Sequence, residues 1–211
     1  MRITRRNLAA FAMAFGIGGH PGAANADQTS DLLGGINQVI ERPDVLRGNF
    51  EQTKTLAGFK KPLISKGTFV IDRARGVQWI TTAPFSSTLV VTRERLTTWD
   101  EGGRKQQLDT KREPGLRAVN DLIMGMLSGD LKVLATRFDT KGVMKSAQSW
   151  SLSLTPKDAG LAGFIKAIDI EGGRHVDEVR MVESSGDLSV IRFTNNTATS
   201  LNPSELVRYG Q

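Results

Sequence analysis

The fold of this chain is decided by Pro62-Leu63-Ile64-Ser65-Lys66-Gly67-Thr68-Phe69-Val70-Ile71-Asp72-Arg73, followed shortly by Gly76-Val77-Gln78-Trp79. Side chains in a β-strand alternate between its two faces, so Phe69 and Ile71 would share one face of the first segment. In the same way, Val77 and Trp79 would share one face of the second segment. We therefore expect consecutive strands of an antiparallel sheet that has one apolar face.

Strand-sized segments separated by turn signals extend from this stretch in both directions. The turns are marked by prolines, by short charged clusters and by glycine pairs such as Gly102-Gly103 and Gly172-Gly173. About eleven strands are expected. They are residues 46–56, 63–72, 76–82, 86–93, 96–101, 104–109, 138–145, 150–155, 164–171, 176–183 and 188–194. The order is a meander without helices between successive strands, which predicts an open antiparallel sheet.

Three segments have the apolar period of helices: residues 31–41, 115–127 and 131–136. In the first two, the apolar positions recur every three or four residues and would form one face. These positions are Leu32, Leu33, Ile36, Val39 and Ile40, and then Leu116, Val119, Leu122, Ile123, Met126 and Leu127. Together with the strands, they predict a single α+β domain over residues 27–211.

Residues 1–26 have the three parts of a cleavable export signal. A cationic start precedes an apolar stretch over residues 8–18, and Ala24-Asn25-Ala26 matches a small-x-small cleavage site. The alternative, an amphipathic helix of the mature fold, is weaker because all three parts occur in the expected order. The mature chain should begin at Asp27. Paired arginines keep a twin-arginine route open, but the general secretory route is favoured.

Export changes what the charge implies. The formal net charge of the full chain is +6, and removal of Arg2, Arg5 and Arg6 lowers it to +3. The remaining basic residues are scattered among acids, so no nucleic-acid partner is expected. No later segment approaches the roughly 18 apolar residues of a membrane span. We expect a soluble protein that is not embedded in a membrane.

The chain contains no cysteine. Disulfides, a thiol nucleophile and thiolate metal ligands are therefore excluded. Anchoring through a lipid-modified N-terminal cysteine is excluded for the same reason.

Catalytic machinery is hard to assemble from this sequence. The mature chain has a single histidine, His175, which we expect to be an exposed residue of the turn that follows Gly172-Gly173. No G-x-S-x-G elbow, phosphate-binding loop or metal-binding motif is present after the signal. A pair of carboxylates brought together from distant strands is the alternative that the sequence leaves open. We expect a protein without enzymatic activity, cofactor or metal.

Several motifs occur in a characteristic order along the mature chain. After the leading helix they are Phe50-x-Gln52-x-Lys54, Gly67-x-Phe69-x-Ile71, Arg73 six residues before Trp79, Pro84, and the turn and strand over residues 183–195 that ends in Phe193-Thr194-Asn195. In order and spacing, these motifs resemble the LolA family, the periplasmic carriers of outer-membrane lipoproteins. The resemblance covers most of the mature chain, although no single motif is decisive.

The resemblance implies an incomplete antiparallel β-barrel, with helices packed into its open mouth as a lid over an apolar cavity. Residues 31–41 and 115–136 are the candidates for this lid. In the family, an arginine at the position of Arg73 interacts with the lid and helps to couple its opening to cargo transfer. Here Ala74 replaces the usual proline and Arg75 adds a charge. The alternative for Arg73 is a solvated arginine in a turn.

The apolar side chains of the sheet and of the second helix either line this cavity or fill a core. The resemblance favours the cavity. The candidate lining residues are Phe50, Phe69, Ile71, Val77, Trp79, Leu89, Val91, Trp99, Leu122, Ile123 and Met126.

The resemblance also implies a function. We expect a monomeric periplasmic carrier that binds acyl chains of lipoproteins, or of related envelope lipids, and moves them from the inner to the outer membrane. Its partners would be the acylated cargo, an inner-membrane donor complex and an outer-membrane acceptor. A membrane-anchored acceptor would need the missing cysteine, so the chain resembles the soluble shuttle. The alternatives are a glycolipid or lipid-linked pigment cargo, and a structural half-barrel without cargo.

Overall fold

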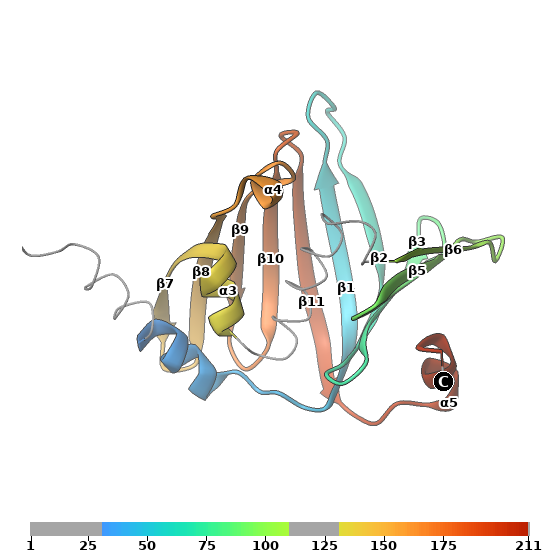
Figure 1. Cartoon of the computed structure of the whole chain (residues 1–211), viewed down its shortest axis with the longest axis horizontal. Coiled ribbons are helices and arrows are strands. Elements are labelled where there is room, and N and C mark those ends of the chain that lie inside the picture. Colours follow the sequence, from blue (N-terminus) through green and yellow to red (C-terminus); the bar gives the residue numbers. More distant parts are fainter. Residues whose placement is uncertain (1–30, 110–130, 211) are drawn as a thin grey trace, which may run out of the picture.

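The computed structural model describes residues 31–109 and 131–210 of the 211-residue chain. In this part, 11 strands form one sheet in the order β6-β5-β4-β3-β2-β1-β11-β10-β9-β8-β7, and every neighbouring pair is antiparallel (Figure 1). The first and last strands of the chain's sheet thus lie at its centre and are paired with each other, which places β6 and β7 at two free edges. The predicted open antiparallel sheet is confirmed.

The strand boundaries follow the alternation of the sequence closely. They are β1 Val45–Thr55, β2 Leu63–Asp72, β3 Gly76–Ala83, β4 Ser87–Thr92, β5 Arg95–Trp99, β6 Lys105–Asp109, β7 Phe138–Ser146, β8 Ser149–Pro156, β9 Ile165–Gly172, β10 Val176–Glu183 and β11 Leu188–Ala198. The main difference is at β11, which continues beyond the predicted residue 194. It does so because β11 and β1 resume their pairing after a β-bulge, with Arg47 opposite Thr197.

Four helices occur in the described residues: residues 31–39, α3 Leu131–Arg137, α4 Ala159–Ala162 and α5 Pro203–Arg208. The first and α3 match their predictions, whereas the predicted helix 115–127 and the signal 1–26 lie outside the described residues. Helices α4 and α5 were not predicted. Helix α5 nevertheless has a readable start, since Asn202 and Glu205 form a capping box and Pro203 begins the helix.

The two faces of the sheet differ in composition. We call the face that carries Phe69 and Trp79 the inner face, and the face that carries Gln78 the outer face. Phe69 is opposite Trp79, and Trp79 is opposite Leu89, so these three side chains share the inner face. From β1 to β4 this face is largely aliphatic and aromatic.

The main core lies on the inner face of β7 to β10. There, helix 31–39, α3 and α4 pack against the strands, and Figure 1 shows the first two in blue and yellow in front of them. The buried members are Leu33, Ile36, Leu134, Phe138, Trp150, Leu152, Leu154, Leu161, Ile165, Ile168 and Ile170. This half of the sheet is therefore joined to its helices by ordinary apolar packing.

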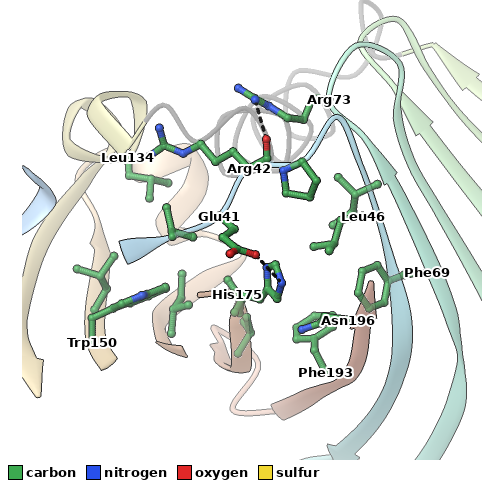
Figure 2. A pocket seen from close by; sticks show the side chains of 17 residues that line it. Glu41, Arg42, Leu46, Phe69, Arg73, Leu134, Trp150, His175, Phe193 and Asn196 are labelled. Atoms are coloured by element: carbon green, nitrogen blue, oxygen red, sulfur yellow. Dashed lines mark hydrogen bonds and ion pairs between the residues drawn. The ribbon is translucent and has the colours of Figure 1, made fainter. Parts of the chain in front are cut away.

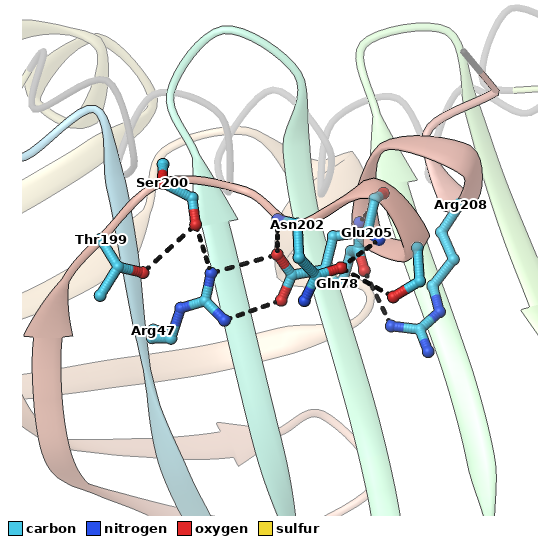
Figure 3. A network of polar contacts seen from close by, with 8 residues as sticks. Arg47, Gln78, Thr199, Ser200, Asn202, Glu205 and Arg208 are labelled. Atoms are coloured by element: carbon cyan, nitrogen blue, oxygen red, sulfur yellow. Dashed lines mark hydrogen bonds and ion pairs between the residues drawn. The ribbon is translucent and has the colours of Figure 1, made fainter.

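Helix α5 and its C-cap lie on the outer face, where they are bound by side chains of β1, β3 and β5 (Figure 3). The Gln78 side chain is fully buried and donates to the carbonyl oxygen of Glu205 at 2.6 Å. The Glu205 carboxylate forms an ion pair with Arg47 at 2.9 Å, and the Tyr209 hydroxyl donates to the Gly76 carbonyl at 3.2 Å. The end of the chain is thus fixed by a polar network rather than by apolar packing alone.

Candidate functional site: an apolar cavity on the inner face

A cavity of about 180 Å³ lies against the inner face where β1, β2 and β8 to β11 meet the segment 40–43 and α3 (Figure 2). Its lining in the described part of the chain is mainly aliphatic and aromatic. The lining residues are Ile40, Glu41, Arg42, Pro43, Leu46, Phe69, Ile71, Arg73, Leu134, Trp150, Leu152, Ile170, His175, Val176, Val179, Phe193 and Asn196. The interior of the cavity thus suits an apolar ligand, and its polar side chains are few.

The segment 40–43 crosses one end of this cavity, between helix 31–39 and β1. Its backbone is held by three hydrogen bonds. Ile40 N–H donates to the Ile36 carbonyl at 2.9 Å, Glu41 N–H donates to the Arg174 carbonyl at 2.8 Å, and an Arg73 amino group donates to the Arg42 carbonyl at 3.2 Å. Arg174 Nε also donates to the Glu41 carboxylate at 2.8 Å, while His175 Nε2 lies 3.6 Å from that carboxylate. Polar contacts therefore hold the segment 40–43 at this end of the cavity, whereas most of the residues that line the cavity are apolar.

Four aromatic residues of the inner face form a cluster that continues from the cavity: Phe50, Phe69, Trp79 and Phe193. Phe50 stacks on Trp79 with ring centroids 3.8 Å apart. Phe193 meets the edges of the other two rings, with centroid distances of 5.3 Å to Phe69 and 6.1 Å to Trp79. Since Phe69 and Phe193 also line the cavity, the aromatic cluster and the cavity form one continuous apolar surface.

Of the predicted site residues, Phe69, Ile71 and Arg73 line the cavity. Five others share the inner face but lie outside the lining: Phe50, Val77, Trp79, Leu89 and Val91. Leu122, Ile123 and Met126 fall outside the described residues. A ligand-binding role for any of them remains a proposal.

Trp99 requires a correction. In the β4–β5 register it is opposite Thr88, and Thr88 is opposite Ile80. These positions belong to the outer face, so Trp99 does not point toward the cavity. The existence of strand β5 was predicted correctly. Alternation shows which residues of β5 share a face, but only the pairing with β4 shows which of these two faces is the inner one.

His175 also differs from the expectation of an exposed turn residue. Its side chain is only 19% exposed, and it lines the cavity just before β10 begins. Trp150, Phe193 and Leu46 line the cavity as well, although none was among the predicted site residues. The alternation of β1 and β11 placed Leu46 and Phe193 on one face, and this signal could have identified them.

Asn196 has no such signal in the sequence. Simple alternation from Phe193 would place Asn196 on the outer face, but the β1–β11 register shifts between Arg47 and Asn49. Asn195 adopts a left-handed backbone with φ of 55° at this bulge. The extra residue turns Asn196 toward the cavity.

Two other kinds of feature are absent from the described residues. No group of three or more residues among them is arranged to hold a metal ion. None of the helices in this part of the chain is long and apolar enough to cross a bilayer.

Comparison with known proteins adds a family to this geometry. The family model of the outer membrane lipoprotein carrier protein LolA matches residues 42–206. This range contains almost the whole sequence from β1 to α5. No curated protein sequence matches the chain.

Several solved structures are similar to this chain at low identity. A LolA superfamily protein from Nitrosomonas europaea is 10% identical with a TM-score of 0.47, and the match covers 83% of this chain and 95% of that one. The match to the MucA/MucB complex from Pseudomonas aeruginosa has 16% identity and a TM-score of 0.46. It covers 87% of this chain and 60% of that one. The match to a putative outer membrane lipoprotein-sorting protein domain from Vibrio parahaemolyticus has 7% identity and a TM-score of 0.44. It covers 88% of this chain and 95% of that one.

Proposed function

Because the chain belongs to the LolA family of outer membrane lipoprotein carrier proteins, we propose that it binds acyl chains of lipoproteins or related envelope lipids and carries them across the periplasm. The observation that supports this most directly is the apolar cavity on the inner face, which is continuous with the aromatic cluster. An acyl chain would lie against Phe69, Phe193 and Val179 and would leave its polar end near the segment 40–43.

The energetic need for such a carrier is large. Each CH₂ group exposed to water costs about 0.8 kcal/mol, so a chain of about fifteen methylenes costs on the order of 12 kcal/mol in total. A lipid with such chains does not cross an aqueous compartment freely at a useful rate. A cavity that hides the chain removes most of this cost, and no nucleotide or metal is needed for binding itself.

The cavity is smaller than a whole acyl chain. A cavity of about 150 Å³ in another protein holds one benzene molecule, so 180 Å³ corresponds to a short segment of a chain. Loading must therefore widen the space by moving helix 31–39 or α3, whose apolar contacts with β8 to β10 would be exchanged for contacts with cargo. Only the difference between these contacts contributes to the affinity, which makes release feasible.

We place this carrier in the periplasm because residues 1–26 have the pattern of a cleavable export signal, with the general secretory route favoured. Transport between two membranes also requires a donor at the inner membrane and an acceptor at the outer membrane. The chain would act between them as a soluble monomer without enzymatic activity.

A matched pair of valine substitutions tests the binding site. Val179 lines the cavity, whereas Val143 is 56% exposed on the edge strand β7. Val179→Glu should weaken binding of a fluorescent hexadecanoyl probe by tenfold or more, since it places a charge in an apolar space, and Val143→Glu should leave binding unchanged. Titrations would be read by fluorescence at a temperature where circular dichroism shows both variants folded.

Failure of the wild-type protein to bind any hexadecanoyl probe would overturn the proposed function. Equal binding by the two valine variants would show that the acyl chain binds elsewhere. Native mass spectrometry of protein purified gently from its host would identify the cargo that the cavity takes.

A further inference from the structure

Among the residues that line the cavity, two buried acceptor atoms near β10 and β11 have no hydrogen-bond partner in the described part of the chain: His175 Nδ1 and Asn196 Oδ1. A buried donor, Arg42 Nε on the segment 40–43, also has none. Buried polar atoms are nearly always paired, because an unpaired one loses its bonds to water without replacement. Two such atoms in one largely apolar cavity therefore suggest that a ligand completes them.

The fold directs Asn196 into the cavity in a specific way. Two residues of β11, Asn195 and Asn196, face the single residue Gly48 of β1 at the bulge. A Cβ atom at Gly48 would lie 2.7 Å from Asn196 Oδ1 and 2.8 Å from the ring of Phe69. The glycine thus leaves the space in which the carboxamide oxygen sits, directly beside an aromatic ring of the cavity.

His175 is directed by a second contact. Its Nε2 atom faces the Glu41 carboxylate at 3.6 Å (Figure 2). Glu41 is itself held by a hydrogen bond from Arg174. In the neutral imidazole, the proton is favoured on the nitrogen that faces the carboxylate. Nδ1 is then an acceptor that points away from Glu41.

The two atoms come from neighbouring strands at the same end of the sheet. The β10–β11 register, in which Glu178 is opposite Arg192, brings the residue before β10 beside the last residues of β11. Figure 2 shows His175 and Asn196 on the same side of the cavity as Phe193. Both are acceptors, so the group that completes them must donate hydrogen bonds.

We propose that His175 and Asn196 form a subsite for the neutral, hydrogen-bond-donating head of an acylated ligand, such as a secondary amide that joins the acyl chain to its carrier. This proposal rests on the proposed carrier function, and it assigns a chemical class to the cargo of the carrier. An apolar wall gives similar affinity to tails of equal length, whereas a site with polar groups to satisfy rejects an analogue that lacks the matching donor. The subsite would thus select the linkage, and the aromatic cluster would hold the tail.

Two ligands that differ in one group provide the test. N-methylhexadecanamide donates an N–H hydrogen bond, and methyl hexadecanoate has an oxygen in its place. Each would displace the fluorescent hexadecanoyl probe from the full-length mature protein. We expect the wild type to prefer the amide by about tenfold, and the single substitutions Asn196→Leu and His175→Phe to reduce this ratio to about two or less.

Asn49→Leu is the matched control, because Asn49 is exposed on the neighbouring strand β1. It should retain the full preference for the amide. Affinity for the ester should remain within about threefold in all variants, since neither lost atom is satisfied by an ester oxygen.

The outcomes separate the two proposals. Equal wild-type affinity for amide and ester would overturn the subsite and leave the carrier function standing. A preference that survives both substitutions would also overturn it, and either variant is sufficient for this if the other fails to fold. Absence of binding for both ligands would remove the carrier function and the subsite together.

Discussion

The outer and inner faces of β1 to β3 are built from alternate residues of the same strands, yet they are completed in different ways. On the outer face, the buried Gln78 donates to Glu205 at 2.6 Å and accepts from Arg208 at 3.3 Å, so α5 supplies partners for both polar groups of this side chain. On the inner face, the cavity retains His175 Nδ1 and Asn196 Oδ1 without partners in the described residues.

This difference distinguishes a packed face from a binding face. A helix of the same chain can satisfy buried polar groups permanently, because it stays in place in the folded protein. A surface that exchanges its cover for a ligand must tolerate incomplete packing in the structure without ligand. We therefore expect substitutions on the outer face to change stability, and substitutions around the cavity to change binding or exchange.

The largest effect is expected from Glu205→Ala on the outer face. The variant loses the ion pair with Arg47 and the carboxylate that accepts from the Asn202 N–H at 2.8 Å, and it leaves the Arg47 guanidinium without this partner. We expect a loss of about 2–4 kcal/mol in the free energy of unfolding. Urea unfolding would measure it.

Glu178→Ala is the control for this variant, because it removes an ion pair on the surface. The Glu178 side chain is 34% exposed, and that of its partner Arg192 is 58% exposed. Its effect should stay below about 1 kcal/mol. Affinity for the hexadecanoyl probe should not change in Glu205→Ala. A weakened affinity in the folded variant would show that the two faces are not independent.

A smaller effect on the outer face should appear at high pH. Burial raises the pKa of the Tyr209 phenol well above its ordinary value, and the hydroxyl donates to the Gly76 carbonyl. The folded protein thus keeps this proton at a pH where the unfolded chain has lost it. The associated stability is complete below about pH 10 and falls above it by at most about 1.4 kcal/mol per pH unit.

Tyr209 is the only tyrosine of the chain, so tyrosinate absorbance reports its ionisation directly. The absorbance of the folded protein should rise at a higher pH than that of the protein in urea. Tyr209→Phe should show a shallower decline of stability above pH 10. Coincident titrations in the folded and unfolded states would contradict the burial of this hydroxyl.

The smallest effect on stability, about 1 kcal/mol, is expected from Arg73→Leu at the cavity. The variant loses the hydrogen bond to the Arg42 carbonyl, which helps to hold the segment 40–43 across the cavity. Exchange of the hexadecanoyl probe should become several-fold faster in stopped-flow displacement. Arg73→Lys retains a hydrogen-bond donor, so its rate of probe exchange should lie between those of the wild type and Arg73→Leu. Unchanged loading and release in Arg73→Leu would leave Arg73 as a simple turn residue.

Most of the sheet could be predicted from the sequence because strand alternation is a local signal. Phe69 and Ile71 are separated by one residue, and their common face follows from backbone geometry alone. The same reasoning failed for Trp99, since its face depends on the β4–β5 register rather than on its own strand. Helix α5 was missed although Asn202-Pro203-Ser204-Glu205 has a readable capping pattern.

The site was predictable only in part. Phe69, Ile71 and Arg73 lie in the stretch that shows the fold most clearly, and all three line the cavity. His175 could not be recognised, because a histidine after two glycines is typical of an exposed turn. Its burial results from contact with the segment 40–43, which is remote in sequence.

The sequence by itself determined an antiparallel sheet with one apolar face, a leading helix and the family to which the chain belongs, because alternation, helical period and motif spacing are properties of neighbouring residues. Only the tertiary structure decided where the cavity lies and which polar atoms remain in it. The bulge at Asn195 and the contact between Glu41 and His175 join segments more than a hundred residues apart in the chain. Such contacts depend on strand register and on the path of the segment 40–43, and neither is encoded in a local pattern.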